Sequence, residues 1–175
     1  MDKALETIND IIKQRGYSIK SDTDEKIIGI NEKNKEIVIF KNPIDKFNVE
    51  HIKQKVSILN TLGIKHCIVI YTNSVTAIAK KLVESSIDVE FELFTQDELQ
   101  YNITEHRLVP KHIKLSEEEA RIFKKTFGIK FPTILKTDPI CKFYNFQRGD
   151  VIKIIRIDNS KENNIPYITH RIVKG

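Results

Sequence analysis

The arrangement of side chains that comes nearest to a catalytic motif in this sequence is an acid-x-Lys tripeptide. Nucleases that hold Mg²⁺ and activate water need one acidic residue, and then acid-x-Lys on a neighbouring strand. Within residues 1–102 that tripeptide occurs once, as Asp24-Glu25-Lys26. It stands at the beginning of a predicted strand, where the end of a strand pair is required, and no Pro-Asp pair precedes it. We therefore interpret it as surface charge on a strand edge and predict no catalytic residues.

The histidines and cysteines form no recognisable metal-binding pattern. His66 and Cys67 are adjacent in a predicted strand, so their side chains point to opposite faces and cannot ligate one ion. His106 and His112 are separated by a proline and belong to different local structures. With no Cys-x-x-Cys motif, Cys67 and Cys141 are predicted to be small buried hydrophobic residues. In the absence of a glycine-rich phosphate loop as well, the sequence predicts no metal site, no cofactor and no small-molecule substrate.

Length, composition and charge indicate an intracellular globular protein. Of the 175 residues, 40% are hydrophobic and 30% charged. No apolar run approaches the ~20 residues needed to span a bilayer, and the N-terminus does not resemble a signal peptide. Residues 1–102 carry 14 basic side chains against 16 acidic ones, whereas residues 103–175 carry 15 against 8. This asymmetry indicates two units with different partners, and the basic unit could face nucleic acid or an acidic protein surface.

The N-terminal half alternates predicted helices and strands. Apolar spacing, capping residues and glycine stops predict helix 2–15, strands 25–31 and 36–41, helix 49–62, strand 65–71, helix 75–85, strand 89–94 and a short helix opened by Thr95-Gln96-Asp97-Glu98. Asn48 would cap the second helix and Gly63 would end it. Strand, helix and strand at this spacing predict a parallel βαβ unit.

The last third combines capped helices with two strands. The patterns predict an extended segment 103–109, a helix 116–127 with a Ser116–Glu119 capping box, a short helix opened by Asp138-Pro139, and strands 151–157 and 167–173 around a polar loop. Asn145 would take the left-handed conformation after the short helix, and Arg148-Gly149-Asp150 would turn into the next strand.

The strand 151–157 is apolar on both faces. Its period-2 pattern places Val151, Ile155 and Ile157 on one face together with Lys153, and Ile152, Ile154 and Arg156 on the other. Burial on both faces within its own domain and contact with a partner protein both explain such a strand, and we keep both interpretations.

Five separated segments of the last third resemble a known family in order and spacing. They are His106 to His112, Leu115 to Glu119, Asp138-Pro139, Gly149 to Arg156 and Tyr167 to Arg171. Together they resemble the C-terminal assembly domain of RNA polymerase subunit 5, which eukaryotic nuclear polymerases share and which has a smaller archaeal counterpart. In the N-terminal part, residues 73–82 are similar to a loop-to-helix segment of the family's jaw domain.

The resemblance implies an α+β fold in two domains. Residues 1–102 would form an α/β jaw with a restriction-endonuclease-like fold but no active site, and residues 103–175 a small mixed α/β assembly domain. The implied function is that of a non-catalytic structural subunit of a multisubunit DNA-directed RNA polymerase. It would dock through its C-terminal domain on the largest subunit, with the jaw near downstream duplex DNA.

The source and the compartment follow from the same resemblance. The archaeal counterpart consists of the second domain alone, so the jaw indicates a eukaryotic-type enzyme. An Ile-Lys-Asn bias makes a large DNA virus a candidate source. We expect the nucleus for a cellular protein, and a viral factory or virion in the cytoplasm for a viral one.

Two sets of site residues are implied. The partner-docking set, taken from the matched segments, is Val109, Pro110, Lys111, His112, Asp138, Pro139, Gly149, Lys153, Arg156 and Arg171. The DNA-proximal set is Asn73, Ser74, Thr76, Lys80 and Lys81. Its short polar side chains would stand near a helix start, which favours phosphate, and its lysines would add positive charge one turn later. The alternative function is a free-standing nucleic-acid-binding module that uses the basic residues 103–175.

Overall fold

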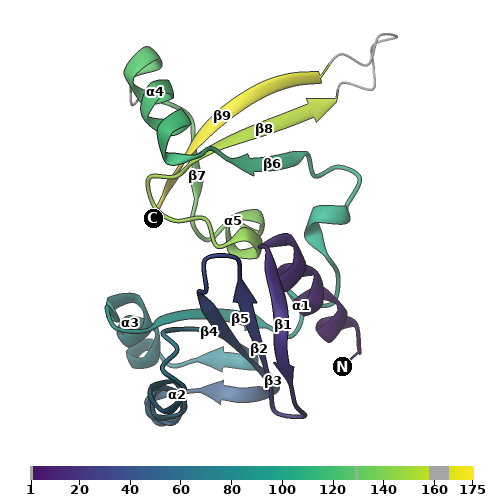
Figure 1. The fold of residues 1–175 in the computed structure, drawn as a ribbon, viewed down its shortest axis with the longest axis vertical. Coiled ribbons are helices and arrows are strands. Elements are labelled where there is room, and N and C mark those ends of the chain that lie inside the picture. Colours follow the sequence, from purple (N-terminus) through teal and green to yellow (C-terminus); the bar gives the residue numbers. More distant parts are fainter. Residues whose placement is uncertain (1, 129, 158–165) are drawn as a thin grey trace. The chain divides into compact units, whose positions relative to one another are not determined.

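The structure, a computed structural model, describes residues 2–128, 130–157 and 166–175. Its contacts divide the chain into two compact units, Met1–Tyr101 and Asn102–Gly175, and each is built on its own mixed sheet (Figure 1). Each unit contains both helices and strands. The α+β class expected from the sequence is confirmed.

The N-terminal unit contains a five-stranded sheet in which the strands follow chain order. The strands are β1 (Tyr17–Asp22), β2 (Lys26–Asn31), β3 (Glu36–Phe47), β4 (His66–Val75) and β5 (Glu90–Thr95). The pairs β1–β2 and β2–β3 are antiparallel, whereas β3–β4 and β4–β5 are parallel. The predicted parallel βαβ unit is therefore confirmed, and β3 joins the two halves of the sheet.

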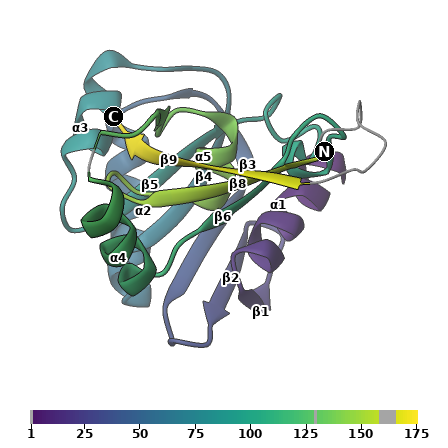
Figure 2. The same ribbon diagram turned by 90° about the horizontal axis from the view of Figure 1, so that it is seen from above.

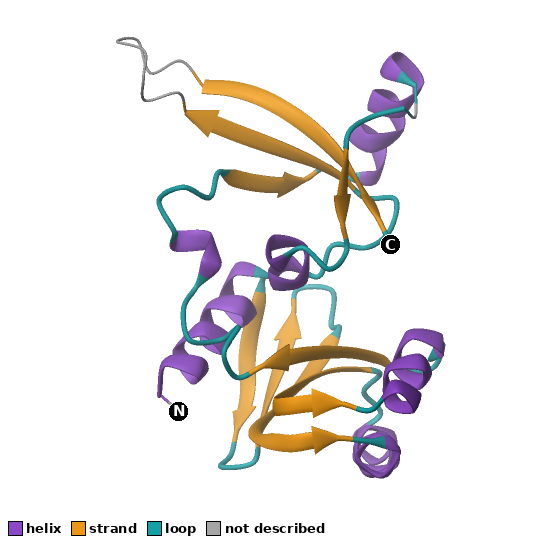
Figure 3. Cartoon of the chain, turned by 180° about the vertical axis from the view of Figure 1, so that it is seen from behind, coloured by secondary structure: helices purple, strands orange, loops and turns teal. Residues whose placement is uncertain are grey.

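Three helices cover this sheet. They are α1 (Asp2–Gln14), α2 (Val49–Leu62) and α3 (Ala77–Ser85). The crossover helices α2 and α3 lie on one side of the sheet and α1 on the other (Figure 3). Because side chains alternate along a strand, Val38 and Phe40 enter the core under α2 and α3, while Ile37 and Ile39 are buried on the opposite face. Both faces of the central strands are therefore closed.

Several boundaries in this unit differ from the sequence-based prediction. Strand β1 was not predicted, since five of its six residues are exposed and the apolar pattern is weak. Strands β3 and β4 run longer than expected. The capping box at Thr95 forms, with the Glu98 amide 3.1 Å from the Thr95 hydroxyl. The predicted short helix does not follow it, and the next residues form turns instead.

The C-terminal unit contains a four-stranded sheet in the order β6-β8-β9-β7. Its elements are η1 (Ile103–Glu105), β6 (Lys111–Lys114), α4 (Glu117–Phe127), β7 (Thr133–Leu135), α5 (Pro139–Tyr144), β8 (Val151–Ile157) and β9 (Pro166–Lys174). Strands β8 and β9 run side by side as an antiparallel pair (Figure 2), β6 is antiparallel to β8, and β7 is parallel to β9.

The predicted caps of this unit are in place. The Ser116 hydroxyl accepts the Glu119 amide at 3.2 Å, and the Asp138 carboxylate accepts the Ile140 amide at 2.9 Å. Asn145 ends α5 in the left-handed conformation with φ 53°. The prediction of an extended segment at 103–109 was wrong, because Asn102 caps a 3-10 turn there. The polar loop at residues 158–165 and the Ile157 side chain lie outside the described residues.

The second sheet has two different faces. One face, which we call the α5 face, carries the core of the unit, where Ile152 and Ile154 pack with Ile140 and Cys141 of α5. The other, which we call the α4 face, carries Val151, Lys153 and Ile155 of β8, because side chains alternate. Helix α4 lies on this second face, and none of its residues is buried. Strand β8 is thus buried by its own unit on the α5 face, and more open on the other.

Candidate functional site

Four members of the expected docking set gather on the α5 face. His112 of β6, Arg156 of β8 and Arg171 of β9 point to this face by the strand register, and Asp138 caps the adjoining helix α5. All four are half-buried. The Arg171 guanidinium donates to the Thr133 carbonyl at 2.9 Å, which holds it against β7. The set therefore forms a cationic surface with one carboxylate at its border.

The His112 ring is fixed within this surface. Its Nδ1 lies 2.7 Å from the Pro110 carbonyl oxygen. Burial lowers the pKa of His112 below its ordinary value, and the positive charges of Arg156 and Arg171 act in the same direction. The Pro110 carbonyl and the Asp138 carboxylate oppose this shift without reversing it. His112 is consequently neutral at pH 7, so the two arginines supply the positive charge.

The remaining members of the docking set lie elsewhere. Lys111 and Lys153 project from the α4 face by the same register. Val109 packs at the border of the C-terminal core, and Pro139 is exposed at the start of α5. Gly149 has φ 89°, and its carbonyl accepts the Lys124 Nζ at 2.8 Å. Gly149 is therefore a turn residue whose conformation a side chain would strain.

The α4 face carries an aromatic cluster. The Phe123 ring lies 4.4 Å from the His170 ring and 4.7 Å from Phe131, measured between centroids. Phe127, at the end of α4, is 65% exposed and 5.0 Å from Phe123. Burial lowers the pKa of His170, as does the positive charge of Lys153. This is a half-open apolar surface bordered by basic side chains.

The expected DNA-proximal residues do not form one helix start. Asn73 and Ser74 belong to β4, which continues to Val75, and the Asn73 amide donates to the Asp45 carboxylate. Thr76 caps α3, with its hydroxyl 3.3 Å from the Ala79 amide nitrogen. Lys80 and Lys81 are exposed on α3. The lysines remain available to a phosphate backbone, whereas Asn73 and Thr76 already bond within the unit.

A buried ionic cluster in the N-terminal unit was not predicted. The Arg15 guanidinium donates to both carboxylate oxygens of Glu92, at 2.6 and 2.7 Å. The His66 Nε2 lies 2.7 Å from the same carboxylate. Burial raises the pKa of Glu92, but the charge of Arg15 and the hydrogen bonds from His66 and Arg15 outweigh it, so the pKa of this carboxyl is lowered. Glu92 shares a strand face with buried Phe94, which is the sequence signal that could have found it.

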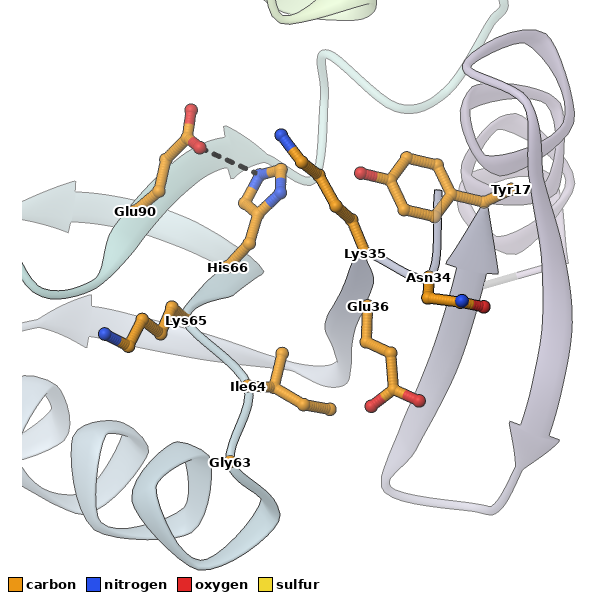
Figure 4. Close-up of a pocket in the computed structure, with 9 residues that line it drawn as sticks. All are labelled: Tyr17, Asn34, Lys35, Glu36, Gly63, Ile64, Lys65, His66 and Glu90. Atoms are coloured by element: carbon orange, nitrogen blue, oxygen red, sulfur yellow. Dashed lines mark ion pairs between the residues drawn. The ribbon is translucent and has the colours of Figure 1, made fainter. Parts of the chain in front are cut away.

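A pocket of about 380 Å³ opens beside this cluster (Figure 4). His66 lines it, and the Glu90 carboxylate reaches to 4.0 Å from the His66 Nε2. The side chains of Tyr17 and Lys35 point toward the same ring. Acidic and basic groups are mixed in the lining, so the pocket shows no preference for one ligand charge.

The described residues show little that could support catalysis. Asp24 stands in the turn between β1 and β2, and Lys26 begins β2. Among residues 2–128, 130–157 and 166–175, no three His, Cys, Asp or Glu side chains lie together as metal ligands would. Cys67 and Cys141 are buried, and burial raises the pKa of the Cys141 thiol to about 12, so this cysteine is not a reactive thiolate. No helix in the described part of the chain is both long and apolar enough to cross a membrane.

Comparison with known proteins identifies the family. A family model described as RNA polymerase Rpb5, C-terminal domain, matches residues 101–173. The chain is 34% identical over 142 residues to DNA-directed RNA polymerases I, II, and III subunit rpabc1 of Dictyostelium discoideum, an alignment that covers 78% of this chain and 71% of the relative. The chain belongs to the RNA polymerase Rpb5 family. The resemblance found in the sequence is confirmed.

The chain is also similar to a viral protein. The putative DNA-directed RNA polymerase subunit 454R of Invertebrate iridescent virus 6 is 37% identical over 118 residues, which cover 61% of this chain and 60% of the viral protein. Among solved structures, the ATP-dependent type ISP restriction-modification enzyme LlaBIII bound to DNA matches 81% of this chain and 12% of its own, with 14% identity and a TM-score of 0.38. A likeness that weak supports no conclusion about fold or function.

Proposed function

We propose that the chain is a non-catalytic subunit of a multisubunit DNA-directed RNA polymerase and that it docks through residues 102–175 on the largest subunit. Membership of the Rpb5 family is the observation that carries this proposal. The family match at residues 101–173 coincides with the compact unit Asn102–Gly175. That unit has its own core, its own capped helices and its own sheet, so it has the parts of an independent docking domain.

The charge of the unit supports contact with an acidic protein surface. Residues 103–175 carry 15 basic side chains against 8 acidic ones. On the α5 face, Arg156 and Arg171 are half-buried and flank the neutral His112, and such a surface attracts carboxylates. On the α4 face, Lys153 lies opposite His170 of the aromatic cluster, and Lys111 projects from the same face. Both faces thus combine apolar area with positive charge.

We further propose that the N-terminal unit serves as the jaw and lies near downstream duplex DNA. Lys80 and Lys81 are exposed on α3 and would contact phosphates without reading bases. Residues 1–102 as a whole carry a slight excess of acidic side chains. The contact would therefore be weak and would depend on assembly into the polymerase. Inside the cell, the nucleus or a viral factory is the place where such an assembly works.

Affinity purification tests the subunit role directly. The tagged full chain, expressed in its source under mild salt, should recover the large catalytic subunits of an RNA polymerase in stoichiometric amounts. A fragment of residues 102–175 should recover the same chains, whereas a fragment of residues 1–101 should not. If the 102–175 fragment is folded but never assembles, the proposal that this unit carries the docking surface is wrong.

The free-standing nucleic-acid-binding module remains the second candidate, because the basic charge is concentrated in residues 103–175. Such a module should bind duplex DNA alone, with an affinity that falls steeply as salt rises. Titration of labelled DNA with the purified chain at low and at roughly physiological salt separates the two candidates. Tight, strongly salt-dependent binding without polymerase recovery would favour the module.

A further inference from the structure

Strand β9 is paired on both sides over only part of its length. Strand β8 pairs with it from Pro166 to Ile172, whereas β7 pairs with it only from Ile172 to Lys174. Within the described residues, the stretch Tyr167–Arg171 therefore has a neighbouring strand on one side alone. A strand of this kind presents backbone groups that another chain can pair with.

The hydrogen bonds at the end of β9 define which groups point outward. The Ile172 amide donates toward β7, to the Pro132 carbonyl at 3.1 Å, and the Val173 amide donates to the β8 side, to the Asp150 carbonyl at 3.0 Å. Since these directions alternate along a strand, the amide and carbonyl groups of Ile168 and His170 point away from β8. No strand partner stands there among the described residues.

The side chains around this edge are apolar and open to solvent. Tyr167 is 48% exposed on the α5 face, and Ile168 is 50% exposed on the α4 face. Protected edges usually carry a β-bulge, a charge pointing inward or a proline in the strand. The β8–β9 register is continuous, and the single proline is the first residue of β9. The edge is thus long enough and regular enough to accept a strand.

The charge of the two strands indicates what kind of segment would fit. Neither β8 nor β9 contains an acidic residue, whereas Lys153, Arg156 and Arg171 are basic. Lys153 lies on the α4 face, and both arginines lie on the α5 face, so a strand added at the edge would meet positive charge on each side. A second copy of β9 would set like charges against each other, which opposes self-pairing.

We propose that the free edge of β9 at Ile168–His170 receives an extended segment of another polymerase subunit as an added β-strand, and that this segment alternates apolar and acidic residues. Main-chain hydrogen bonds to Ile168 and His170 would supply the affinity, and the arginines and Lys153 would select the acidic side chains. This inference rests on the proposed function and specifies how the C-terminal unit is held.

Amide hydrogen exchange tests the pairing in the intact assembly. The probe is the polymerase purified with the tagged full chain, compared with the same chain alone. The Ile168 and His170 amides should exchange rapidly in the free chain and at least about tenfold more slowly in the complex. The Thr169 and Arg171 amides, which point to β8, should be slow in both. Unchanged rapid exchange at Ile168 in a complete complex would overturn the inference and leave the subunit role intact.

A pair of substitutions at one position tests the backbone contact separately. Ile168→Pro removes an outward amide that no strand uses within the described part of the chain, so β8–β9 pairing should survive, while the incoming strand loses a hydrogen bond and meets the ring. Ile168→Thr changes the side chain and keeps the amide. We expect Ile168→Pro to weaken assembly at least about tenfold more than Ile168→Thr, with equal circular dichroism for both.

The possible results distinguish a failure of the added strand from a failure of the proposed function. If both variants assemble equally, the added strand is excluded at this edge. If Ile168→Pro does not fold, the exchange comparison on the wild-type chain decides. Slowing that depends on the concentration of the isolated chain would assign the edge to self-pairing and contradict the acidic partner. Failure of the wild-type chain to recover polymerase subunits would remove the proposed function, and this inference with it.

Discussion

Arg15 and Glu92 form a bidentate ion pair across 77 residues of sequence, with both side chains less than a tenth exposed. Arg15 follows α1, and Glu92 lies in β5 at the far edge of the sheet order. His66 of β4 contacts the same carboxylate at 2.7 Å. One buried carboxylate therefore ties the α1–β1 junction to two parallel strands that follow much later in the chain.

Glu92→Gln should destabilise the N-terminal unit strongly. The neutral amide leaves the Arg15 guanidinium buried without its charge partner, and breaking such a pair costs about 3–5 kcal/mol. Urea unfolding followed by circular dichroism at pH 7 measures the loss. Glu90→Gln is the matched control on the same strand, since the Glu90 side chain is 46% exposed and should cost less than about 1 kcal/mol.

The same pair predicts a pH dependence. Because the folded-state pKa of Glu92 is lowered, its stabilisation is complete above the ordinary glutamate pKa and is lost as the pH falls through the folded value. The stability difference between the wild-type chain and Glu92→Gln should therefore shrink as the pH is lowered from about 4.3, the ordinary value, toward about 2. A constant difference over that range would contradict the ion pair.

Asp138→Asn should lower the pKa of His112 further. The Asp138 carboxylate favours the protonated ring, and asparagine removes that charge while still capping α5. Titration of the imidazole resonances by NMR measures the shift. Glu117→Gln, an exposed change at the start of α4, is the control and should leave His112 unchanged. An unchanged His112 pKa in Asp138→Asn would show that the carboxylate does not act on this ring.

Gly149→Ala should destabilise the C-terminal unit by about 1 kcal/mol or more, because a side chain is strained at φ 89° even though no atom lies within 4 Å of the added Cβ. Arg148→Ala, at the exposed neighbouring position, should change stability by less than about 0.5 kcal/mol. Denaturant midpoints of the two variants provide the comparison. Equal midpoints would mean that this turn adapts to a side chain.

The double change Lys80→Glu and Lys81→Glu should shorten the lifetime of promoter complexes at low salt while leaving polymerase assembly intact. Two exposed positive charges on α3 become negative and repel the phosphate backbone. Raising the salt should reduce the difference, since exposed charges are screened. Lys53→Glu on α2 is the control, because Lys53 is also exposed. Equal lifetimes for the wild-type chain and both variants at low salt would contradict a contact between α3 and DNA.

Local signals in the sequence located the capped helices well. The Ser116–Glu119 box, Asp138 before Pro139, and Asn145 all act through neighbours within a few residues, so their roles can be read from the sequence. The weak strands β6 and β7 were not predicted, because they depend on residues far away in the sequence. Strand β6 has one apolar residue among basic ones, and β7 has only three residues, so each owes its existence to the strand beside it.

The positions of the functional side chains depend even more on residues that are distant in the sequence. The docking set was taken from adjacent residues such as Lys111 and His112, yet strand alternation sends these two side chains to opposite faces. The extension of β4 to Val75 removed Asn73 from the predicted helix start, because that segment pairs with β3. The Arg15–Glu92 pair links residues that no local pattern connects. Sequence patterns therefore located segments, whereas pairing across the sheet decided which side chains meet.

Strand β3 belongs to both halves of the N-terminal sheet, and this has a consequence for how the protein is made. Its antiparallel partner β2 precedes it closely in the chain, and β1 pairs with β2 in turn, so those contacts close over short loops. Its parallel partner β4 follows only after the whole of α2. During synthesis from the N-terminus, the β1–β3 meander can assemble while α2 is still being made. When β4 leaves the ribosome, the edge of β3 is therefore already formed. The slow parallel pairing of β4 then adds one strand to an existing sheet.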